Sequence, residues 1–141
     1  MPPMSHEQML AFLSEGARIG KLATTRADGR PHVAPIWFVV DGDDILFTTG
    51  AKTVKGRTLA RDPRAALCVD DDTPPFSYVL VEGTAALSED LDEMVEWATK
   101  IGARYMGEDQ AEAFGRRNGV PGELLVRLTP TELIAEDRIA D

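Results

Sequence analysis

The residues best suited to chemistry are a group of cations in the middle of the chain. Five basic side chains fall between residues 52 and 64 against a single acid: Lys52, Lys55, Arg57, Arg61 and Arg64. The whole chain carries 15 basic and 24 acidic residues, a net charge of −9, so this segment reverses the sign of its surroundings. Lys and Arg bind phosphate and carboxylate groups through charge-assisted hydrogen bonds. The segment predicts an anion site; the alternative is a solvated basic helix face that pairs with the many acids.

Two hydroxyl residues and a glycine precede these cations. The run Thr48-Thr49-Gly50 ends an apolar segment, and Ala51 leads directly into Lys52. A strand end with free backbone N–H groups, hydroxyls and nearby cations suits a phosphate-bearing ligand. Further along, Arg61 lies four residues after Arg57 and shares its helix face, whereas Asp62-Pro63-Arg64 has the alternative role of fixing a turn.

A proline interrupts the apolar segment Ala34-Pro35-Ile36-Trp37-Phe38. Proline donates no ladder hydrogen bond, so this point is predicted to lie at a sheet edge or a bulge. An edge with free carbonyls beside Ile36 and Trp37 suits a planar heterocycle. The alternative is that Trp37 and Phe38 pack only in the core or an interface.

The sequence offers little support for disulfide or metal chemistry. One cysteine and two histidines allow no internal disulfide and disfavour a zinc site, so we predict no metal. Cys68, within an apolar run, is interpreted as a small core residue. Asp70-Asp71-Asp72 is interpreted as a solvated turn, because the other oxygen ligands of a calcium loop are missing.

Composition narrows the class of protein. A length of 141 residues corresponds to one domain, 1–141. The net charge of −9 argues against broad binding of nucleic acid or anionic membranes. No apolar run is long enough to span a bilayer, and no signal peptide is visible at residues 1–7. We therefore expect a cytoplasmic protein.

The elements that must position these residues are mostly strands. Asp28-Gly29 and Asp41-Gly42 are typical hairpin turns. A capping box at Ser5 and Gln8 predicts the first helix, and Ser88 is the expected cap of a later amphipathic helix that reaches Tyr105. Helices are predicted over 6–14, 52–61, 88–105 and 108–117, and strands over 18–25, 32–40, 44–49, 65–69, 77–86, 124–128 and 132–135.

This order predicts a mainly β fold with flanking helices, an α+β antiparallel barrel of six or more strands. A doubly wound sheet would require regular alternation of strands and helices, which is absent. The single domain divides into an N-terminal helix, a barrel core, a helical segment and closing strands, at residues 1–15, 18–87, 88–118 and 123–137.

An ordered series of motifs supports a more specific interpretation. The stretches IGKLAT (19–24), DGRPH (28–32) and PIWF (35–38) together resemble the flavin-binding split β-barrel proteins, the pyridoxamine-phosphate-oxidase-like superfamily. The stretches AKTVKGRTLARDPR (51–64) and SYVLVEGTA (77–85) look like the branch that binds the deazaflavin coenzyme F420. The resemblance covers residues 6 to about 87.

The resemblance implies a homodimer with cofactor sites at the subunit interface. Lys55, with Arg57 and Lys52, would meet the cofactor's phosphate and acidic tail. The phosphate groove would be lined by Thr48, Thr49, Gly50, Ala51 and Thr53. The ring would lie along Pro35, Ile36 and Trp37. Ser77 and Tyr78 would lie near the cofactor, from the same or the other subunit.

The implied activity is hydride transfer from reduced F420 to an unsaturated, electron-poor small organic substrate. No catalytic residue or proton donor is assigned. The C-terminal arginines lack the pattern of a pyridoxamine-phosphate substrate site: Arg104, Arg116, Arg117, Arg127 and Arg138. Two alternatives stay open. One is an FMN-dependent oxidoreductase of the same fold, although FMN has a shorter tail and needs fewer cations; the other is a non-catalytic F420- or flavin-binding protein.

Overall fold

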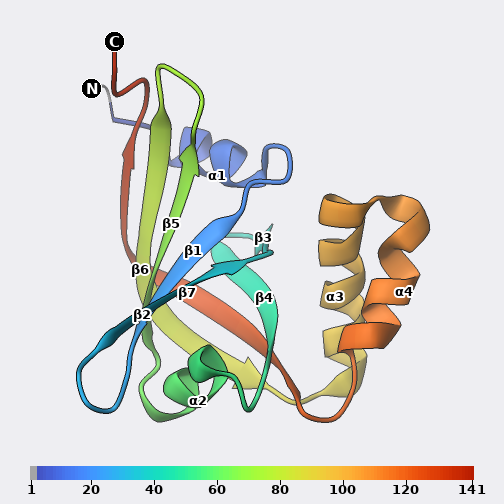
Figure 1. Cartoon of the computed structure of the whole chain (residues 1–141). Helices are drawn as coiled ribbons and strands as arrows, with labels where there is room; N and C mark the ends of the chain where they lie inside the picture. Colours follow the sequence, from blue (N-terminus) through green and yellow to red (C-terminus); the bar gives the residue numbers. More distant parts are fainter. Residues whose placement is uncertain (1–2) are drawn as a thin grey trace.

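The protein folds as one curled antiparallel sheet with four helices around it (Figure 1). The computed structural model describes residues 3–141; residues 1–2, the start of the predicted segment 1–15, lie outside the described residues. The strands are β1 (Gly20–Thr25), β2 (Pro31–Ile36), β3 (Val39–Asp41), β4 (Asp44–Gly50), β5 (Arg64–Asp71), β6 (Ser77–Ser88) and β7 (Glu123–Glu136). The helices are α1 (His6–Ser14), α2 (Val54–Arg61), α3 (Leu91–Met106) and α4 (Glu108–Asn118).

The strand order explains how the sheet curls. It runs β2-β1-β5-β6-β7-β4-β3, so β2 and β3 lie at opposite edges. Only Trp37 and Phe38 separate these two strands in the sequence, so the sheet must bend until its edges approach each other. Within residues 3–141 no ladder pairs β2 with β3, and the barrel stays open along this line. The predicted α+β, antiparallel split barrel is confirmed.

The local signals in the sequence act as expected. The Ser5–Gln8 capping box opens α1, and Gly29, with φ 89°, turns the β1–β2 hairpin. Pro35 lies on the edge strand β2, where its missing N–H leaves no ladder bond unmade. The predicted strand 32–40 is divided, because the chain leaves one edge of the sheet at Ile36 and joins the other at Val39.

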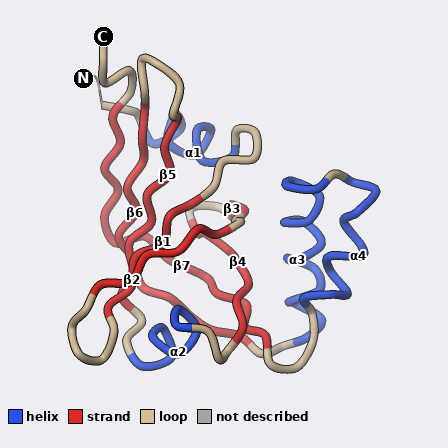
Figure 2. The backbone as a smooth tube through the Cα atoms, viewed as in Figure 1, coloured by secondary structure: helices blue, strands red, loops and turns tan. Residues whose placement is uncertain are grey.

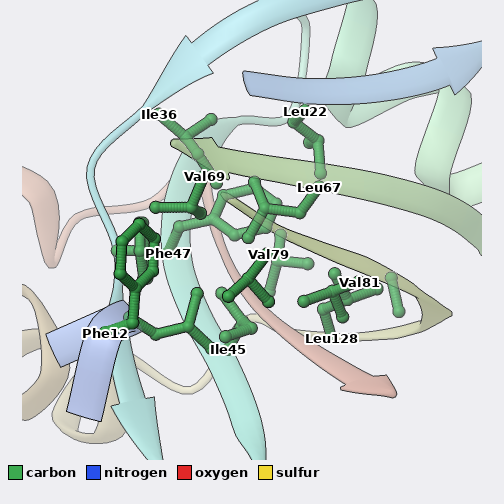
Figure 3. Close-up of a cluster of buried hydrophobic side chains, with 14 of the residues drawn as sticks. Phe12, Leu22, Ile36, Ile45, Phe47, Leu67, Val69, Val79, Val81 and Leu128 are labelled. Carbon is green, nitrogen blue, oxygen red and sulfur yellow. The ribbon is translucent and has the colours of Figure 1, made fainter. Parts of the chain in front are cut away.

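The core fills the inside of the curled sheet. Phe38, Ile45, Val69 and Val79 are wholly buried, and Figure 3 shows such side chains converging from several strands, with Phe12 reaching them from α1. Cys68 was expected in this core, but it is only half-buried. Since its neighbours on β5 point inward, its own side chain faces outward. Burial and nearby Asp70 raise the pKa of its thiol.

Two further expectations need correction. The cap of α3 is Asp90, whose carboxylate accepts the N–H of Glu93, while Ser88 binds the N–H of Asp90 and the carboxylate of Glu93 instead. The closing strands form one continuous strand, β7. It passes Pro130 through a register shift opposite Glu82 and Gly83, because a bulge tolerates the missing N–H of proline.

Helices α3 and α4 form a tight hairpin beside β4 (Figure 2). A Cβ at Gly115 would lie 2.0 Å from Thr99 Oγ1, and one at Gly119 would lie 2.2 Å from Val95 Cγ2. Only glycine permits this approach, so the two helices behave as one packed unit. No helix in residues 3–141 combines the length and the apolar character that crossing a membrane requires.

Arg104 and Tyr105 connect this helical hairpin by hydrogen bonds to the chain segment between β2 and β3. The guanidinium of Arg104 donates to the carbonyls of Phe38 at 2.6 Å, Leu13 at 2.7 Å and Gly16 at 2.9 Å. The Tyr105 hydroxyl accepts the N–H of Phe38 and donates to the Arg18 carbonyl at 2.6 Å. Burial lowers the pKa of Arg104 and raises the pKa of Tyr105. The backbone at Phe38 is thereby held from both its N–H and its carbonyl.

Candidate functional site

The turn between β4 and α2 places a helix start beside a strand end. Thr53 caps α2: its hydroxyl accepts the N–H of Gly56 at 3.1 Å and donates to the Gly50 carbonyl at 2.8 Å. It also lies 3.0 Å from the hydroxyl of Thr49. Lys52 therefore precedes the helix, which was predicted to begin there, because threonine is a strong N-cap residue.

A glycine allows α2 to lie directly against this strand end. A Cβ added at Gly56 would meet the carbonyl oxygen of Gly50 at 2.2 Å and that of Ala51 at 3.2 Å. Since real Cβ atoms do not approach backbone oxygen so closely, any larger residue would push the helix away. The position of Lys55, one residue earlier, depends on this contact.

A pocket of about 340 Å³ opens beside this turn. The structure brings together in its lining most of the residues predicted for the cofactor: Pro35, Ile36, Trp37, Thr48, Thr49, Gly50, Thr53 and Lys55. They come from β2 at one edge of the sheet and the residue after it, from β4 next to the strand at the other edge, and from the start of α2. The curl of the sheet unites the predicted ring residues with the predicted phosphate residues.

The anion-binding groups of this corner are unpaired. Within residues 3–141 no carboxylate lies within 4.0 Å of the side-chain nitrogens of Lys52, Lys55 or Arg57. The N–H groups of Val54 and Lys55 are in the first turn of α2, where a helix supplies no acceptor. Free N–H groups, the positive end of the helix dipole and an unpaired lysine together favour an anion. The ion pairs with neighbouring acids that the alternative of a solvated basic helix face includes are absent at these three residues.

The cations of 52–64 do not share one cradle. Lys55 faces the pocket just described, whereas Arg57 and Arg61 line a second hollow of about 440 Å³ with Arg26 and Arg30 from the β1–β2 hairpin. Residues two apart lie on different sides of a helix, and residues four apart share a side. The spacing thus predicts the pairing of Arg57 with Arg61 and their separation from Lys55.

Arg64 takes the structural role that the sequence left open. Its backbone N–H, Nε and Nη2 all donate to the carboxylate of Asp62, at 3.2, 3.0 and 2.8 Å. These bonds from Arg64 lower the pKa of Asp62 to about 2. The Asp62-Pro63-Arg64 segment fixes the turn into β5.

The remaining predicted residues lie apart from the pocket. Ala51 and Lys52 belong to the turn before α2, next to the pocket but not in its lining. Ser77 and Tyr78 begin β6, near the chain ends and away from α2 (Figure 1). The Ser77 hydroxyl is engaged within the chain, donating to Asp137 at 2.7 Å and accepting the N–H of Arg138.

No motif in the sequence indicated the other pocket wall, which comes from α3, α4 and the start of β7: Ile101, Phe114, Arg117, Asn118 and Glu123. The spacing of Phe114, Arg117 and Asn118 puts them on one side of a helix. That spacing was the available signal, but nothing local to residues 108–118 indicates that this side faces Trp37.

An aromatic group connects the two walls. The Trp37 ring stacks on Tyr105, with ring centres 5.0 Å apart and planes 2° from parallel. Phe114 meets Trp37 at 5.7 Å in a tilted arrangement. Trp37 nevertheless keeps 37% of its surface exposed. An exposed aromatic side chain held by a rigid stack is suited to cover a planar ligand.

Comparison with known proteins gives consistent matches. The family model described as pyridoxamine 5'-phosphate oxidase matches residues 5–136. A Mycobacterium tuberculosis protein named F420H(2)-dependent biliverdin reductase is 29% identical over 102 residues, which span 70% of this chain and 71% of the relative.

Two solved structures match over most of their length. The crystal structure of the conserved hypothetical protein Rv2991 from Mycobacterium tuberculosis has a TM-score of 0.84 and 27% identity, covering 96% of this chain and 86% of that one. A structure named F420 reductase has a TM-score of 0.70 and 30% identity, covering 87% of this chain and 94% of that one.

Proposed function

The chain belongs to the pyridoxamine 5'-phosphate oxidase family of oxidoreductases, and from that premise we propose that it is an F420-dependent reductase of an unsaturated small organic substrate. The relatives named for F420 support this cofactor over the others used in the family. The observation that carries the proposal is the single pocket joining Lys55 and the Thr53-capped start of α2 to Pro35, Ile36 and Trp37.

The two ends of the pocket suit the two ends of such a cofactor. At one end the free N–H groups of α2, the Thr48 hydroxyl and the Lys55 ammonium would hold the phosphate. At the other end the edge strand offers unpaired backbone groups at Pro35, and Trp37 covers a flat ring. Reduced F420, when bound, would supply the hydride.

The cations beyond the pocket favour a long anionic ligand. Arg57 and Arg61 lie on the far side of α2 from Lys55, so a cofactor with an acidic tail meets more positive charge than one with a single phosphate. FMN is the alternative cofactor. Anaerobic titration separates the two: F420 is expected to bind more tightly than FMN, and a yellow flavoprotein as purified would contradict that expectation.

We also propose that two copies associate through the outer sheet face, which consists of outward side chains on β2, β1, β5, β6 and β7: Val33, Ala23, Ala66, Cys68, Leu80 and Ile134. The ladder places Val33 beside Ala23, Cys68 beside Leu80, and Leu80 beside Ile134. Val33 is 67% exposed and Ile134 41%. Charged side chains on the same face, Lys21 opposite Cys68 and Glu82 opposite Ala66, interrupt and border these apolar ones, and an apolar patch bordered by polar residues is typical of an interface between subunits.

Replacing Leu80 with Glu is expected to convert a dimer into a monomer of 15.4 kDa and to weaken F420 binding, because the new charge would be buried between subunits without a partner. Sedimentation velocity measures the mass, and fluorescence titration measures F420 binding. Ala113→Glu, on the exposed side of α4, is the control and should change neither. A wild-type monomer, or a monomeric variant with full affinity, would contradict the interface.

Replacing Lys55 with Ala is expected to weaken F420 binding by roughly 1.5–3 kcal/mol, the usual contribution of a charged hydrogen bond. The loss should shrink as salt is raised, because salt screens part of the attraction. Lys100→Ala is the matched control, since Lys100 lies on α3 and pairs with Glu96 at 3.4 Å. An unchanged dissociation constant for the Lys55 variant would remove this residue from the site.

A further inference from the structure

The wall of the pocket supplied by α4 has no role in the cofactor assignment. Phe114, Arg117 and Asn118, here called the α4 face, line the same pocket as Lys55. Arg116, the neighbour of Arg117, points elsewhere and lies 3.8 Å from Glu112. One helix end therefore carries two adjacent arginines, one turned toward the pocket and one turned to solvent.

The guanidinium of Arg117 has no ion-pair partner in the described part of the chain. Within residues 3–141 no carboxylate lies within 4.0 Å of its guanidinium, and no hydrogen bond to another residue uses it. The guanidinium lies beside an aromatic ring, with Cζ of Arg117 5.4 Å from the centre of Phe114. Glu123, the acid in the pocket lining, forms no ion pair with either Arg117 or Lys55. The pocket thus keeps a second free cation besides Lys55.

The aromatic contacts connect this cation to the ring end of the pocket through Phe114. Phe114 touches both Arg117 and Trp37, and Trp37 in turn is fixed on Tyr105. Lys55 belongs instead to α2, next to Thr53. A flat molecule lying beside Phe114, on a cofactor ring that already covers the open face of Trp37, would bring a carboxylate at its rim within reach of Arg117, whose planar fork is suited to bind both oxygens.

Given the proposed function, on which this step rests, we infer that the α4 face selects the substrate: a planar conjugated molecule that carries a carboxylate, with Arg117 as the specificity-determining residue. Asn118 adds an amide that can donate to the same group. The rigidity of the α3–α4 hairpin and its attachment through Arg104 and Tyr105 keep the α4 face at a fixed distance from Trp37.

The test uses a matched pair of ligands, para-carboxybenzylideneacetone and its methyl ester, which share one flat enone and differ in the charge. Calorimetric titration of the protein loaded with oxidised F420 measures binding without turnover. Wild type is expected to bind the acid about 10- to 100-fold more tightly than the ester, the range for one charged hydrogen-bonded contact. Arg117→Gln should remove that preference while leaving the dissociation constants of the ester and of F420 unchanged.

Arg116→Gln is the control and should retain the preference, because Arg116 points away from the pocket and pairs with Glu112. A wild type without preference, or a preference that survives in Arg117→Gln, overturns the inference. Weakened F420 binding in Arg117→Gln also overturns it, by assigning Arg117 to the cofactor, and leaves the proposed function intact. Failure of wild type to bind F420 instead defeats the proposed function, and the same two ligands can then be titrated into the protein alone.

Discussion

Replacing Arg104 with Met should lower the free energy of unfolding by about 3 kcal/mol, although Arg104 is a charged residue with no acidic partner among residues 3–141. Its guanidinium donates to three backbone carbonyls, and two of these belong to the buried residues Leu13 and Phe38. A buried carbonyl that loses its donor costs about 1–3 kcal/mol. The third carbonyl, that of Gly16, is exposed and would be hydrated.

Urea unfolding, followed by circular dichroism, measures this effect. Arg116→Met is the control: its side chain is exposed and its pair with Glu112 spans 3.8 Å, so its loss should cost less than about 1 kcal/mol. Arg104→Lys should fall between the two variants, because one ammonium cannot reach three divergent carbonyls. Equal stability of the Arg104 and Arg116 variants would show that the α3–α4 hairpin is held by its apolar contacts alone.

Replacing Gly56 with Ala should weaken F420 binding by roughly 10- to 100-fold, the loss expected when a charged hydrogen bond such as that of Lys55 is broken. The new Cβ would lie 2.2 Å from the carbonyl oxygen of Gly50, so α2 must shift and carry Lys55 and Thr53 with it. Helix propensity alone predicts the opposite change in stability, a gain of about 1 kcal/mol. We expect the clash to win, with a net loss of about 1–3 kcal/mol.

The sign of the stability change therefore distinguishes the two effects. Thermal unfolding measures it, and fluorescence titration with F420 measures the binding. Ala60→Ser adds one atom to the exposed side of the same helix and should alter neither. A Gly56 variant that is more stable than wild type and binds F420 normally would show that the contact between α2 and Gly50 is loose.

The features predicted correctly from the sequence are those that depend on neighbouring residues. The Ser5–Gln8 capping box, the Asp28-Gly29 turn and the edge position of Pro35 each follow from local backbone chemistry. Local signals failed where two nearby residues could each serve as the helix cap. Both Ser88 and Asp90 can cap a helix, and the choice of Asp90 places the first turn of α3.

Only one wall of the candidate site was predicted from the sequence. The turn at Thr53 and Lys55 has a recognisable composition, and the structure brings it to Trp37 through the curl of the sheet. The opposite wall could not be foreseen, since Phe114 and Arg117 are brought to the pocket by the packing of α3 on β4 and by the Arg104 bonds. Ser77 and Tyr78, predicted near the cofactor, lie at the other end of β6, and their part in the site stays a prediction for the dimer.

The chain crosses from one edge of the open barrel to the other at Trp37 and Phe38. This crossing also affects the order in which parts of the molecule fold. The pocket is complete only when residues 101–123 join the wall formed by β2 and Trp37. The β4 wall in turn pairs with β7, with Thr49 opposite Leu124. Contacts between such distant segments form late and slowly, because a long loop must close first. After dilution from denaturant, strand signal should therefore recover before the ability to bind ligand, and the lag would report the docking of the helical hairpin onto a sheet already formed.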